Sequence, residues 1–322
     1  MTLYHKLPPG PLDIVGDVHG EFPALQALMD HLGYDEEGLH PQNRKLVFVG
    51  DLIDRGPDSL AVVYAVRAMW EAGRAFAVLG NHELNLLLGR LRSGNQWFHG
   101  EPEHMPDGRL LEQRLAGETD RDECLSFFRR LPLVLERRDL RVVHACWDQA
   151  SVDRLKKVED AVSVHEQIED QLVGEVEGRK ARQSLEQQLR LQNLNPVRVL
   201  TSGLEEACQE PFMAGGSLRR QQRSRWWCDY QDPQTVVFGH YWRSKTNHIH
   251  FQKGPDLFAD EPALEPLGPN GNAWCVDYSM GFRSRLQLKG DSTEAVGLAA
   301  LRYPEKELVF APEALPQKRV GE

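Results

Sequence analysis

The sequence predicts an α/β fold in which short parallel strands alternate with helices. Three times within the first hundred residues, a short apolar run ends in glycine and polar residues and is followed by a helical pattern of apolar residues. Units of this kind form parallel strand pairs, and sites in such sheets lie beyond the carboxyl ends of the strands. The polar residues stand at these ends, so we expect the function of the protein to lie there.

Each predicted strand leads directly into its polar loop. The three strand–loop pairs, in chain order, are 13–15 with 16–20, 45–49 with 50–56, and 75–79 with 80–83. Apolar residues from Leu25 to Leu32 recur at helical spacing, and a second helix is expected from about Ser59 to Ala72. A third helical stretch follows the last loop and continues through Leu88.

The rest of the chain predicts a second sheet and an insertion. Strands are expected at 140–143 and 235–238, and runs further along are expected to build the second sheet of a sandwich, at 274–277, 297–301 and 307–310. Residues 151 to about 195 are charged and show helical spacing. We therefore expect a single domain over 1–322 with a helical insertion or lid at about 151–230. Alternatively, this segment is a solvated helical face without a role in catalysis.

Composition excludes several classes of protein. The chain has 322 residues, with 38 Lys and Arg against 48 Asp and Glu and a net charge of −10, which argues against general nucleic-acid binding. The first ten residues lack an apolar stretch of signal-peptide length and no later run could span a bilayer, so we expect a cytoplasmic protein without membrane contact. The five scattered cysteines form no C-x-x-C pair and indicate neither a disulfide framework nor a zinc ribbon.

The polar residues at five strand ends predict a metal site. Two residues on an extended segment, such as Asp17 and His19, point to the same side. With the other strand ends they make up a set of potential ligands: Asp17, His19, Asp51, Asn81, His144 and His240. Oxygen and nitrogen donors without thiolate suit two divalent ions, with Mn²⁺ expected and Fe or Zn²⁺ as alternatives. A two-metal site suits phosphoester hydrolysis because it can hold both the attacking and the leaving oxygen.

A simpler interpretation exists for each acidic residue alone. Aspartate is among the best helix N-caps, and the segments that follow look helical. Independent caps do not explain the paired histidines or Asn81. The coincidence of all five motifs favours the metal site.

The same residues resemble a known family. The motifs that carry the resemblance are Gly16-Asp17-Val18-His19-Gly20, Gly50-Asp51-x-x-Asp54-Arg55-Gly56, Gly80-Asn81-His82-Glu83, Val143-His144 and Gly239-His240. They look like the signature of the calcineurin-like metallophosphoesterases, in the branch that contains Ser/Thr phosphoprotein phosphatases and bacterial diadenosine tetraphosphatases. With this resemblance we expect a four-layer αββα sandwich of two mixed sheets flanked by helices, with the helical insertion.

The resemblance implies a role for each ligand. Asp17 and His19 would hold the first metal ion and Asp51 would bridge the two ions. The second ion would be held by Asn81, His144 and His240. Many relatives outside this branch have a further histidine ligand two positions after the last of these, where this chain has Trp242.

The catalytic roles follow from charge and from the resemblance together. His82 is expected to donate the proton that the leaving oxygen needs, with Asp54 orienting its ring. Arg55 is expected to bind two phosphoryl oxygens with its planar guanidinium, and Asn81 is also expected to contact phosphate. The family usually uses a second arginine, for which Arg243 or Arg225 is the candidate.

The expected activity is hydrolysis of a phosphomonoester or phosphoanhydride, with a nucleotide-like substrate. The alternatives are a protein Ser/Thr phosphatase and a non-catalytic metal-binding scaffold of the same fold. The Trp226-Trp227 pair follows a basic run made up of Arg219, Arg220, Arg223 and Arg225. This pair either stacks on a base or packs in the core. His248 and His250 are either a further metal pair or the polar face of a strand.

Overall fold

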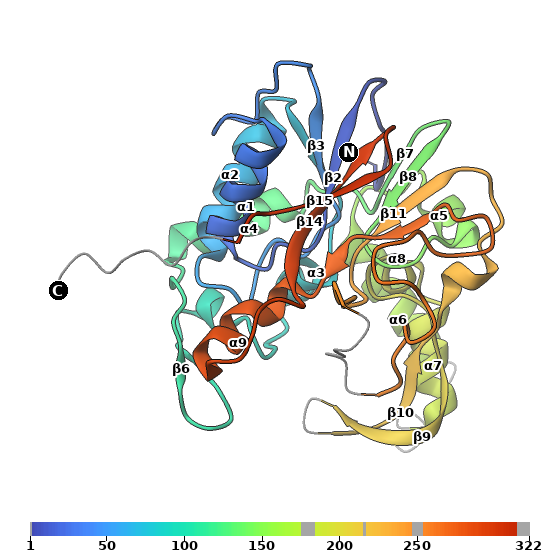
Figure 1. Cartoon of the computed structure of the whole chain (residues 1–322). Coiled ribbons are helices and arrows are strands. Elements are labelled where there is room, and N and C mark those ends of the chain that lie inside the picture. The colour runs from blue at the N-terminus through green and yellow to red at the C-terminus, as the bar shows by residue number, and fades with distance from the viewer. Residues whose placement is uncertain (1, 175–183, 215–216, 247–253, 314–322) are drawn as a thin grey trace.

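The computed structural model describes residues 2–174, 184–214, 217–246 and 254–313. Two mixed sheets lie at the centre, with α1, α2 and α4 on one side and α5 to α8 on the other (Figure 1). Residues from both sheets, such as Ile14 and Val47 from one and Val142 and Val237 from the other, belong to one buried apolar cluster. The sheets therefore pack face to face, and the predicted α/β fold of two mixed sheets flanked by helices is confirmed.

The first sheet contains the three strands expected in the N-terminal part of the chain. Its order is β13-β14-β2-β3-β4, with β15 also paired to β14. The strands β2, β3 and β4 are parallel, and β14 pairs antiparallel with β2. The bounds are β2 (Leu12–Val15), β3 (Lys45–Phe48), β4 (Ala75–Ala77), β13 (Asp277–Tyr278), β14 (Gly297–Tyr303) and β15 (Glu307–Phe310).

The second sheet differs from the expectation. Its order is β1-β7-β8-β11-β12, with bounds β1 (Tyr4–Lys6), β7 (Val134–Glu136), β8 (Leu140–Val143), β11 (Thr235–Phe238) and β12 (Ala273–Cys275). Of the three late runs expected here, only the first contributes a strand, β12. The other two, as β14 and β15, join the first sheet because Ala300 of β14 pairs with Val15 of β2.

Helices on the side of the first sheet follow the apolar spacing of the sequence. Helix α1 (Phe22–Leu32) buries Leu25 and Leu28, and Gly33 ends it with a left-handed φ of 94°. Helix α2 (Ser59–Glu71) is capped by Asp58, whose carboxylate accepts a hydrogen bond from the backbone N–H of Ala61 at 2.9 Å. The short helix α3 (Asn81–Leu87) follows β4, and α4 (Glu118–Phe128) packs outside α2 and α3.

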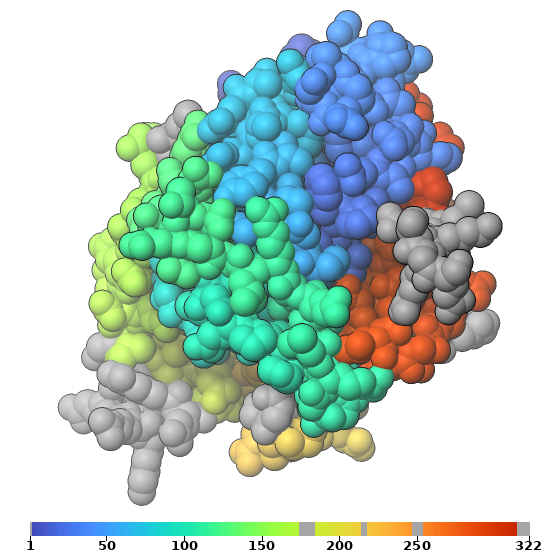
Figure 2. Space-filling view, turned by 90° about the vertical axis from the view of Figure 1, so that its left-hand side faces the viewer, coloured from blue at the N-terminus to red at the C-terminus, as the bar shows by residue number. Residues whose placement is uncertain are grey.

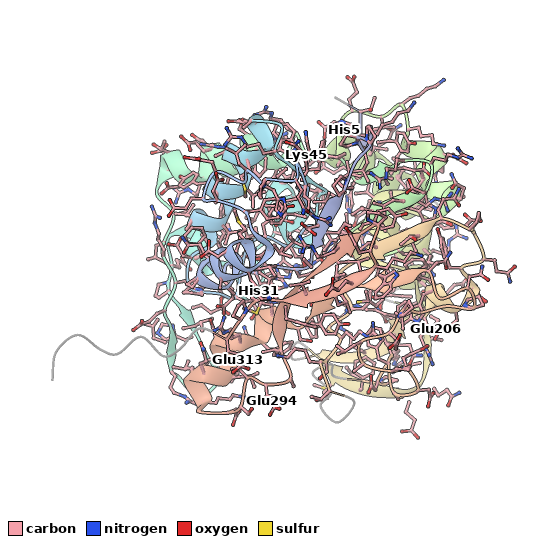
Figure 3. All side chains as sticks on the ribbon, turned by 45° about the horizontal axis from the view of Figure 1, so that its top comes forward. His5, His31, Lys45, Glu206, Glu294 and Glu313 are labelled. Carbon is pink, nitrogen blue, oxygen red and sulfur yellow. The ribbon has the colours of Figure 1, made fainter. Side chains whose placement is uncertain are left out.

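The predicted insertion is only partly helical. Its helices are α5 (Gln149–Leu155), α6 (Ala161–Gly174), α7 (Leu185–Asn193) and α8 (Pro196–Ser202). The strands β9 (Glu205–Ala214) and β10 (Ser217–Arg223) then form an antiparallel hairpin, at the lower right of Figure 1. The helical interpretation is therefore wrong beyond residue 202. His31 of α1 and Glu206 of β9 lie on opposite sides of the central strands (Figure 3).

Shorter elements complete the described chain. The small hairpin of β5 (Glu103–His104) and β6 (Leu110–Leu111) belongs to the segment that covers the lower part of the face shown in Figure 2. Helix α9 (Arg283–Lys289) lies near β6. Among the helices that the structure describes, none combines the length and apolar character that crossing a bilayer requires. His248 and His250 lie outside the described residues.

Candidate active site

The structure brings the six predicted ligands together at the carboxyl ends of five strands. Asp17 and His19 follow β2, Asp51 follows β3, and Asn81 begins α3 after β4. His144 follows β8 and His240 follows β11, so both sheets contribute. All of these side chains are buried except that of Asn81, which is partly exposed.

Two groups of potential ligand atoms share one carboxylate. His19, Asp51 and His82 form one group, and Asp51, His144 and His240 form the other, with ligand atoms within 4.8 Å of one another in each. A carboxylate that belongs to both groups stands where a ligand bridging two cations would stand. The structure thus places His82 close enough to be counted with the ligands, although the sequence assigned it to proton transfer.

Hydrogen bonds fix the orientation of two of these imidazoles. His19 Nδ1 lies 2.9 Å from the carbonyl oxygen of Ile53, and His144 Nδ1 lies 2.7 Å from that of Val49. Since a carbonyl only accepts, each Nδ1 carries a proton, and this orientation leaves the Nε2 atom of each ring facing Asp51. His144 Nε2 is 3.3 Å from Asp51 Oδ1, and His19 Nε2 is 3.8 Å from Asp51 Oδ2. This donor set fits a pair of divalent cations.

The backbone around the ligands adopts conformations that bulky residues rarely take. Positive φ angles occur at His19 (48°), Asp51 (49°), Asp54 (74°), Arg55 (70°) and His240 (71°). Such conformations persist only where the surrounding structure enforces them, and they cluster at functional sites. The loops are thus held in shapes that aim their side chains at one point.

Two glycines allow the backbone to approach the carboxylates. A Cβ atom at Gly239 would lie 2.0 Å from Asp17 Oδ1, and one at Gly80 would lie 2.3 Å from Asp51 Oδ1. The backbone N–H of His240 also donates to Asp17 Oδ2 at 3.1 Å. These contacts explain why glycine stands after β11 and at the start of α3.

Glu83 ties two of the loops together. Its carboxylate accepts hydrogen bonds from the backbone N–H groups of Asp51 (3.0 Å), Leu52 (2.7 Å) and Gly80 (3.0 Å). Burial, with the nearby Asp51 carboxylate, raises the pKa of Glu83 to about 7. The loop after β3 and the start of α3 are therefore held in one arrangement.

His82 and Arg55 lie beside the ligands in the places that their expected roles require. His82 Nδ1 lies 2.5 Å from Asp54 Oδ2, which leaves Nε2 facing the site. The Arg55 guanidinium lies between two imidazoles, with Nη1 at 2.9 Å from His19 Nε2 and Nη2 at 2.9 Å from His82 Nε2. An acid–base group and a planar cation thus flank the Asp51 carboxylate.

Comparison with known proteins agrees with this geometry. The model of the calcineurin-like phosphoesterase family matches residues 10–261. The chain belongs to this family. The asymmetrical bis(5′-nucleosyl)-tetraphosphatase of Anoxybacillus flavithermus is 34% identical to it over 138 residues, which are 41% of this chain and 56% of that protein. The enzyme of the same name from Bacillus thuringiensis is 28% identical over 320 residues, 94% of this chain and 95% of that protein.

The first of these alignments spans about half the length of the curated relative. A protein serine/threonine phosphatase from Saccharomyces cerevisiae has a TM-score of 0.51 and 14% identity, with 98% of this chain and 86% of that chain covered. At this identity the likeness concerns the fold alone. It agrees with the arrangement of sheets and helices described above.

Burial and neighbouring charges strongly shift the pKa values of the ionisable residues in this site. Burial, with the neighbouring Asp277, raises the pKa of Asp17 well above its usual value. For Asp51, burial acts in the same direction but the charges of His144 and His82 outweigh it, so its pKa is lowered well below the usual value. Burial lowers the pKa of His144, but the Asp51 carboxylate outweighs it and raises the pKa to about 9. Bound cations would offset the repulsion between the carboxylates.

The expectation for Arg243 needs correction. Its side chain is buried, 1% exposed, and its Nη2 donates to the carbonyl oxygens of Pro262 and Glu265. A buried guanidinium held by a loop cannot contact substrate, so Arg243 is not a phosphate ligand. The other candidate, Arg225, forms an ion pair with Glu261.

A third arginine, Arg223, reaches the candidate site instead, and it belongs to a basic run that also contains Arg219, Arg220 and Arg225. Arg223 ends β10, and its Nη1 donates to the carbonyl oxygen of His240 at 2.7 Å. It also contributes, after burial, to lowering the pKa of His240 well below the usual value. The sequence signal was the basic run itself, but nothing in the sequence distinguished Arg223 from its neighbours.

The Trp226-Trp227 pair belongs to the core. Trp226 is 7% exposed and Trp227 is fully buried. The Trp227 ring stacks on Phe258 with centroids 5.2 Å apart and an interplanar angle of 1°. The packing interpretation is therefore the right one, and a role in stacking on a base is excluded for this pair.

Proposed function

We propose that this chain is a dinuclear metal-dependent hydrolase that cleaves a phosphoanhydride or phosphomonoester bond in a nucleotide-like substrate. The observation that carries the proposal is the Asp51 carboxylate, which belongs to both groups of potential ligand atoms. Membership of the phosphoesterase family and the tetraphosphatase names of the relatives support the same reaction. The tetraphosphatases among these relatives point to a dinucleoside polyphosphate.

In this proposal Asp17 and His19 would hold the first cation, Asn81, His144 and His240 would hold the second, and Asp51 would contribute to both. Mn²⁺ is the proposed ion because the donors are oxygen and imidazole nitrogen. Two divalent cations would supply positive charge that polarises the phosphoryl group and lowers the pKa of a water molecule. Side chains of the protein are proposed to donate the proton and to bind the phosphoryl oxygens.

His82 is proposed to protonate the leaving oxygen. Its Nδ1 contacts Asp54 at 2.5 Å, so Nε2, which lies 3.8 Å from the Asp51 carboxylate, is the nitrogen that would carry the proton for transfer. In the structure Nε2 accepts from Arg55 Nη2 at 2.9 Å, so it would take up this proton when Arg55 turns to the phosphoryl group. Arg55 and Arg223 are proposed to bind the phosphoryl oxygens, because guanidinium matches their geometry and both approach the histidine cluster. In this scheme the β9–β10 hairpin covers part of the site, because it places Arg223 beside His240.

The cytoplasm is the proposed compartment. All five cysteines are free thiols in the structure, which suits a reducing environment. Localisation of a tagged full-length chain by fractionation of the source cells tests this part, and recovery in the secreted fraction would contradict it.

Hydrolysis assays test the reaction and the substrate class. The metal-loaded protein is compared on diadenosine tetraphosphate, mononucleotides, p-nitrophenyl phosphate and phosphopeptides by kcat/KM, before and after chelation. We expect activity that depends on Mn²⁺ and the highest kcat/KM on the dinucleotide. The highest value on phosphopeptides would favour a protein phosphatase, and no turnover with any divalent ion would favour a scaffold.

Two substitutions test the roles of the side chains. Asp51→Asn should lower the bound metal measured by elemental analysis, whereas Asp30→Asn, on the exposed side of α1, should not. His82→Ala should retain metal and lose turnover, with the smallest loss on p-nitrophenyl phosphate because its leaving group needs no proton. An equal loss on all substrates would contradict the proton-donor assignment.

A further inference from the structure

Trp242 lies against both of the arginines that approach the site. Its ring centroid is 4.9 Å from Arg55 Cζ and 5.5 Å from Arg223 Cζ. These arginines come from distant parts of the chain, one from the loop after β3 and the other from the end of β10. One aromatic ring therefore connects the two guanidinium groups.

The backbone holds Trp242 in this place firmly. Its φ angle is 54°, a conformation that bulky residues rarely adopt. Its backbone N–H donates to Asp277 Oδ2 at 2.7 Å, and Asp277 is itself buried and accepts from the N–H of Ser279 at 2.8 Å. A strained but well-anchored position of this kind indicates that the location of the indole matters.

Each guanidinium is held on one edge by hydrogen bonds and lies against the ring. Arg55 contacts His19 and His82 through Nη1 and Nη2, and Arg223 contacts the His240 carbonyl through Nη1. Two partly buried cations near one site repel each other, and removal from water lowers the pKa of both arginines. An aromatic face attracts a cation, so a shared ring offsets part of this repulsion and limits where each group can lie.

The surroundings of the ring argue against a role in stacking on a nucleobase. Besides the two arginines, Phe282 packs against Trp242 with centroids 4.9 Å apart and an interplanar angle of 83°. A base would have to displace one of these three neighbours.

We propose that Trp242 is a positioning residue that sets the spacing of the Arg55 and Arg223 guanidinium groups for binding a phosphoryl group. This inference rests on the proposed function only in taking these two arginines as phosphate ligands. It applies to any phosphoryl substrate, whether or not the substrate carries a base.

The test compares Trp242→Leu with Trp242→Phe. Binding of inorganic phosphate to the metal-loaded protein is measured by calorimetry, and KM and kcat are measured on p-nitrophenyl phosphate and on diadenosine tetraphosphate. We expect Trp242→Leu to raise the phosphate Kd and both KM values by about tenfold, with a smaller effect on kcat, because two partly buried cation–π contacts are lost. Trp242→Phe should stay within about threefold of the parent, since it retains an aromatic face.

A matched control exists elsewhere on the molecule. Trp70 also lies against an arginine, with Arg130 Cζ 4.6 Å from the ring centroid, but it packs on Phe127 of α4. Trp70→Leu should leave the phosphate Kd unchanged. Metal content is measured for every variant.

Three outcomes would overturn the inference. A loss confined to the dinucleotide, with the phosphate Kd unchanged, would indicate base stacking. Equal losses in both Trp242 variants together with lower metal content would indicate a merely structural role. Absence of phosphate binding by the parent would remove the basis of the inference, whereas phosphate binding without hydrolysis would reject the proposed function alone.

Discussion

The indole nitrogen of Trp97 donates a 2.7 Å hydrogen bond to Asp54 Oδ1, while the other oxygen of this carboxylate lies 2.5 Å from His82 Nδ1. Trp97 is fully buried in a short 3₁₀ turn, Gln96–His99. The same loop is joined to the site by a hydrogen bond from the Arg55 backbone N–H to the Gly94 carbonyl at 3.3 Å. A neutral donor thus fixes the carboxylate that orients the His82 ring.

Trp97→Phe should impair proton transfer without disturbing metal binding. Phenylalanine fills most of the buried space but cannot donate to Asp54, so the carboxylate and the His82 ring lose one restraint. We expect kcat on an alkyl phosphate, whose leaving group needs a proton, to fall by roughly tenfold. The loss on p-nitrophenyl phosphate should be clearly smaller.

Trp274→Phe provides the control for this substitution. Trp274 is also buried, and its indole nitrogen has no hydrogen-bond partner among the described residues. It should therefore affect both substrates alike or not at all. If Trp97→Phe reduced kcat equally on the two substrates, a role through His82 would be untenable.

The contrast between Trp97 and the metal ligands shows how far the sequence alone leads. Each ligand stands next to a strand that hydrophobic patterning identifies, and parallel strands bring their ends to one edge. Trp97 comes from a loop without periodic pattern, so nothing in the sequence relates it to Asp54. The family motif marks a residue by its neighbours in the chain, whereas a partner from another loop requires the fold.

The prediction of a phosphate contact for Arg243 and the prediction of the sheet that contains β14 were wrong for the same kind of reason. Arg243 follows the last ligand motif closely, but positive φ angles at His240 (71°) and Trp242 (54°) turn the chain, and the Arg243 side chain enters the core. The sequence pattern predicts the wrong sheet for β14 because its partner β2 lies near the other end of the chain. Pairing between distant segments is not encoded in local pattern.

Gly239→Ala should reduce metal binding. A Cβ at this position would lie 2.0 Å from Asp17 Oδ1, far inside contact distance, so the carboxylate or the strand end must move. We expect a lower metal content by elemental analysis and a decrease in kcat/KM of roughly 100-fold, since small displacements of reacting groups are costly. At Gly117 an added Cβ would meet only the Asp120 side chain at 3.3 Å, so Gly117→Ala serves as the control. Unchanged metal content in Gly239→Ala would show that Asp17 tolerates the displacement.

Arg243→Met should change stability but not phosphate binding, whereas Arg223→Met should mainly weaken phosphate binding. The first removes the buried guanidinium that donates to the carbonyl oxygens of Pro262 and Glu265 and should lower the free energy of unfolding by about 2 kcal/mol. Its phosphate Kd should not change. The second should raise the phosphate Kd by at least about tenfold, as expected for loss of a charge-assisted contact, with a smaller effect on stability. Weaker phosphate binding by Arg243→Met at unchanged stability would restore Arg243 as a ligand.

His165 should make the stability of the fold depend on pH. It is a fully buried residue of α6, with Nδ1 3.4 Å from Glu169 Oε2, and Arg198 and Arg90 also pair with this glutamate. Burial, with the Arg198 charge, lowers the pKa of His165 to about 4. Between the unfolded pKa of about 6.5 and this value, the unfolded chain binds a proton that the folded chain does not. Stability should therefore decrease as the pH falls through this window.

Urea unfolding of the full chain and of His165→Leu at pH 8, 6.5, 5.5 and 4.5 isolates this contribution. Relative to the variant, the parent should lose up to about 3 kcal/mol between pH 6.5 and 4, and the difference should be constant above pH 7. His31→Leu, at an exposed position of α1 (Figure 3), is the matched control for replacing a histidine by leucine. If the parent instead gained stability relative to His165→Leu as the pH fell, His165 would be protonated in the folded state and paired with Glu169, because a raised folded pKa reverses the sign of the effect.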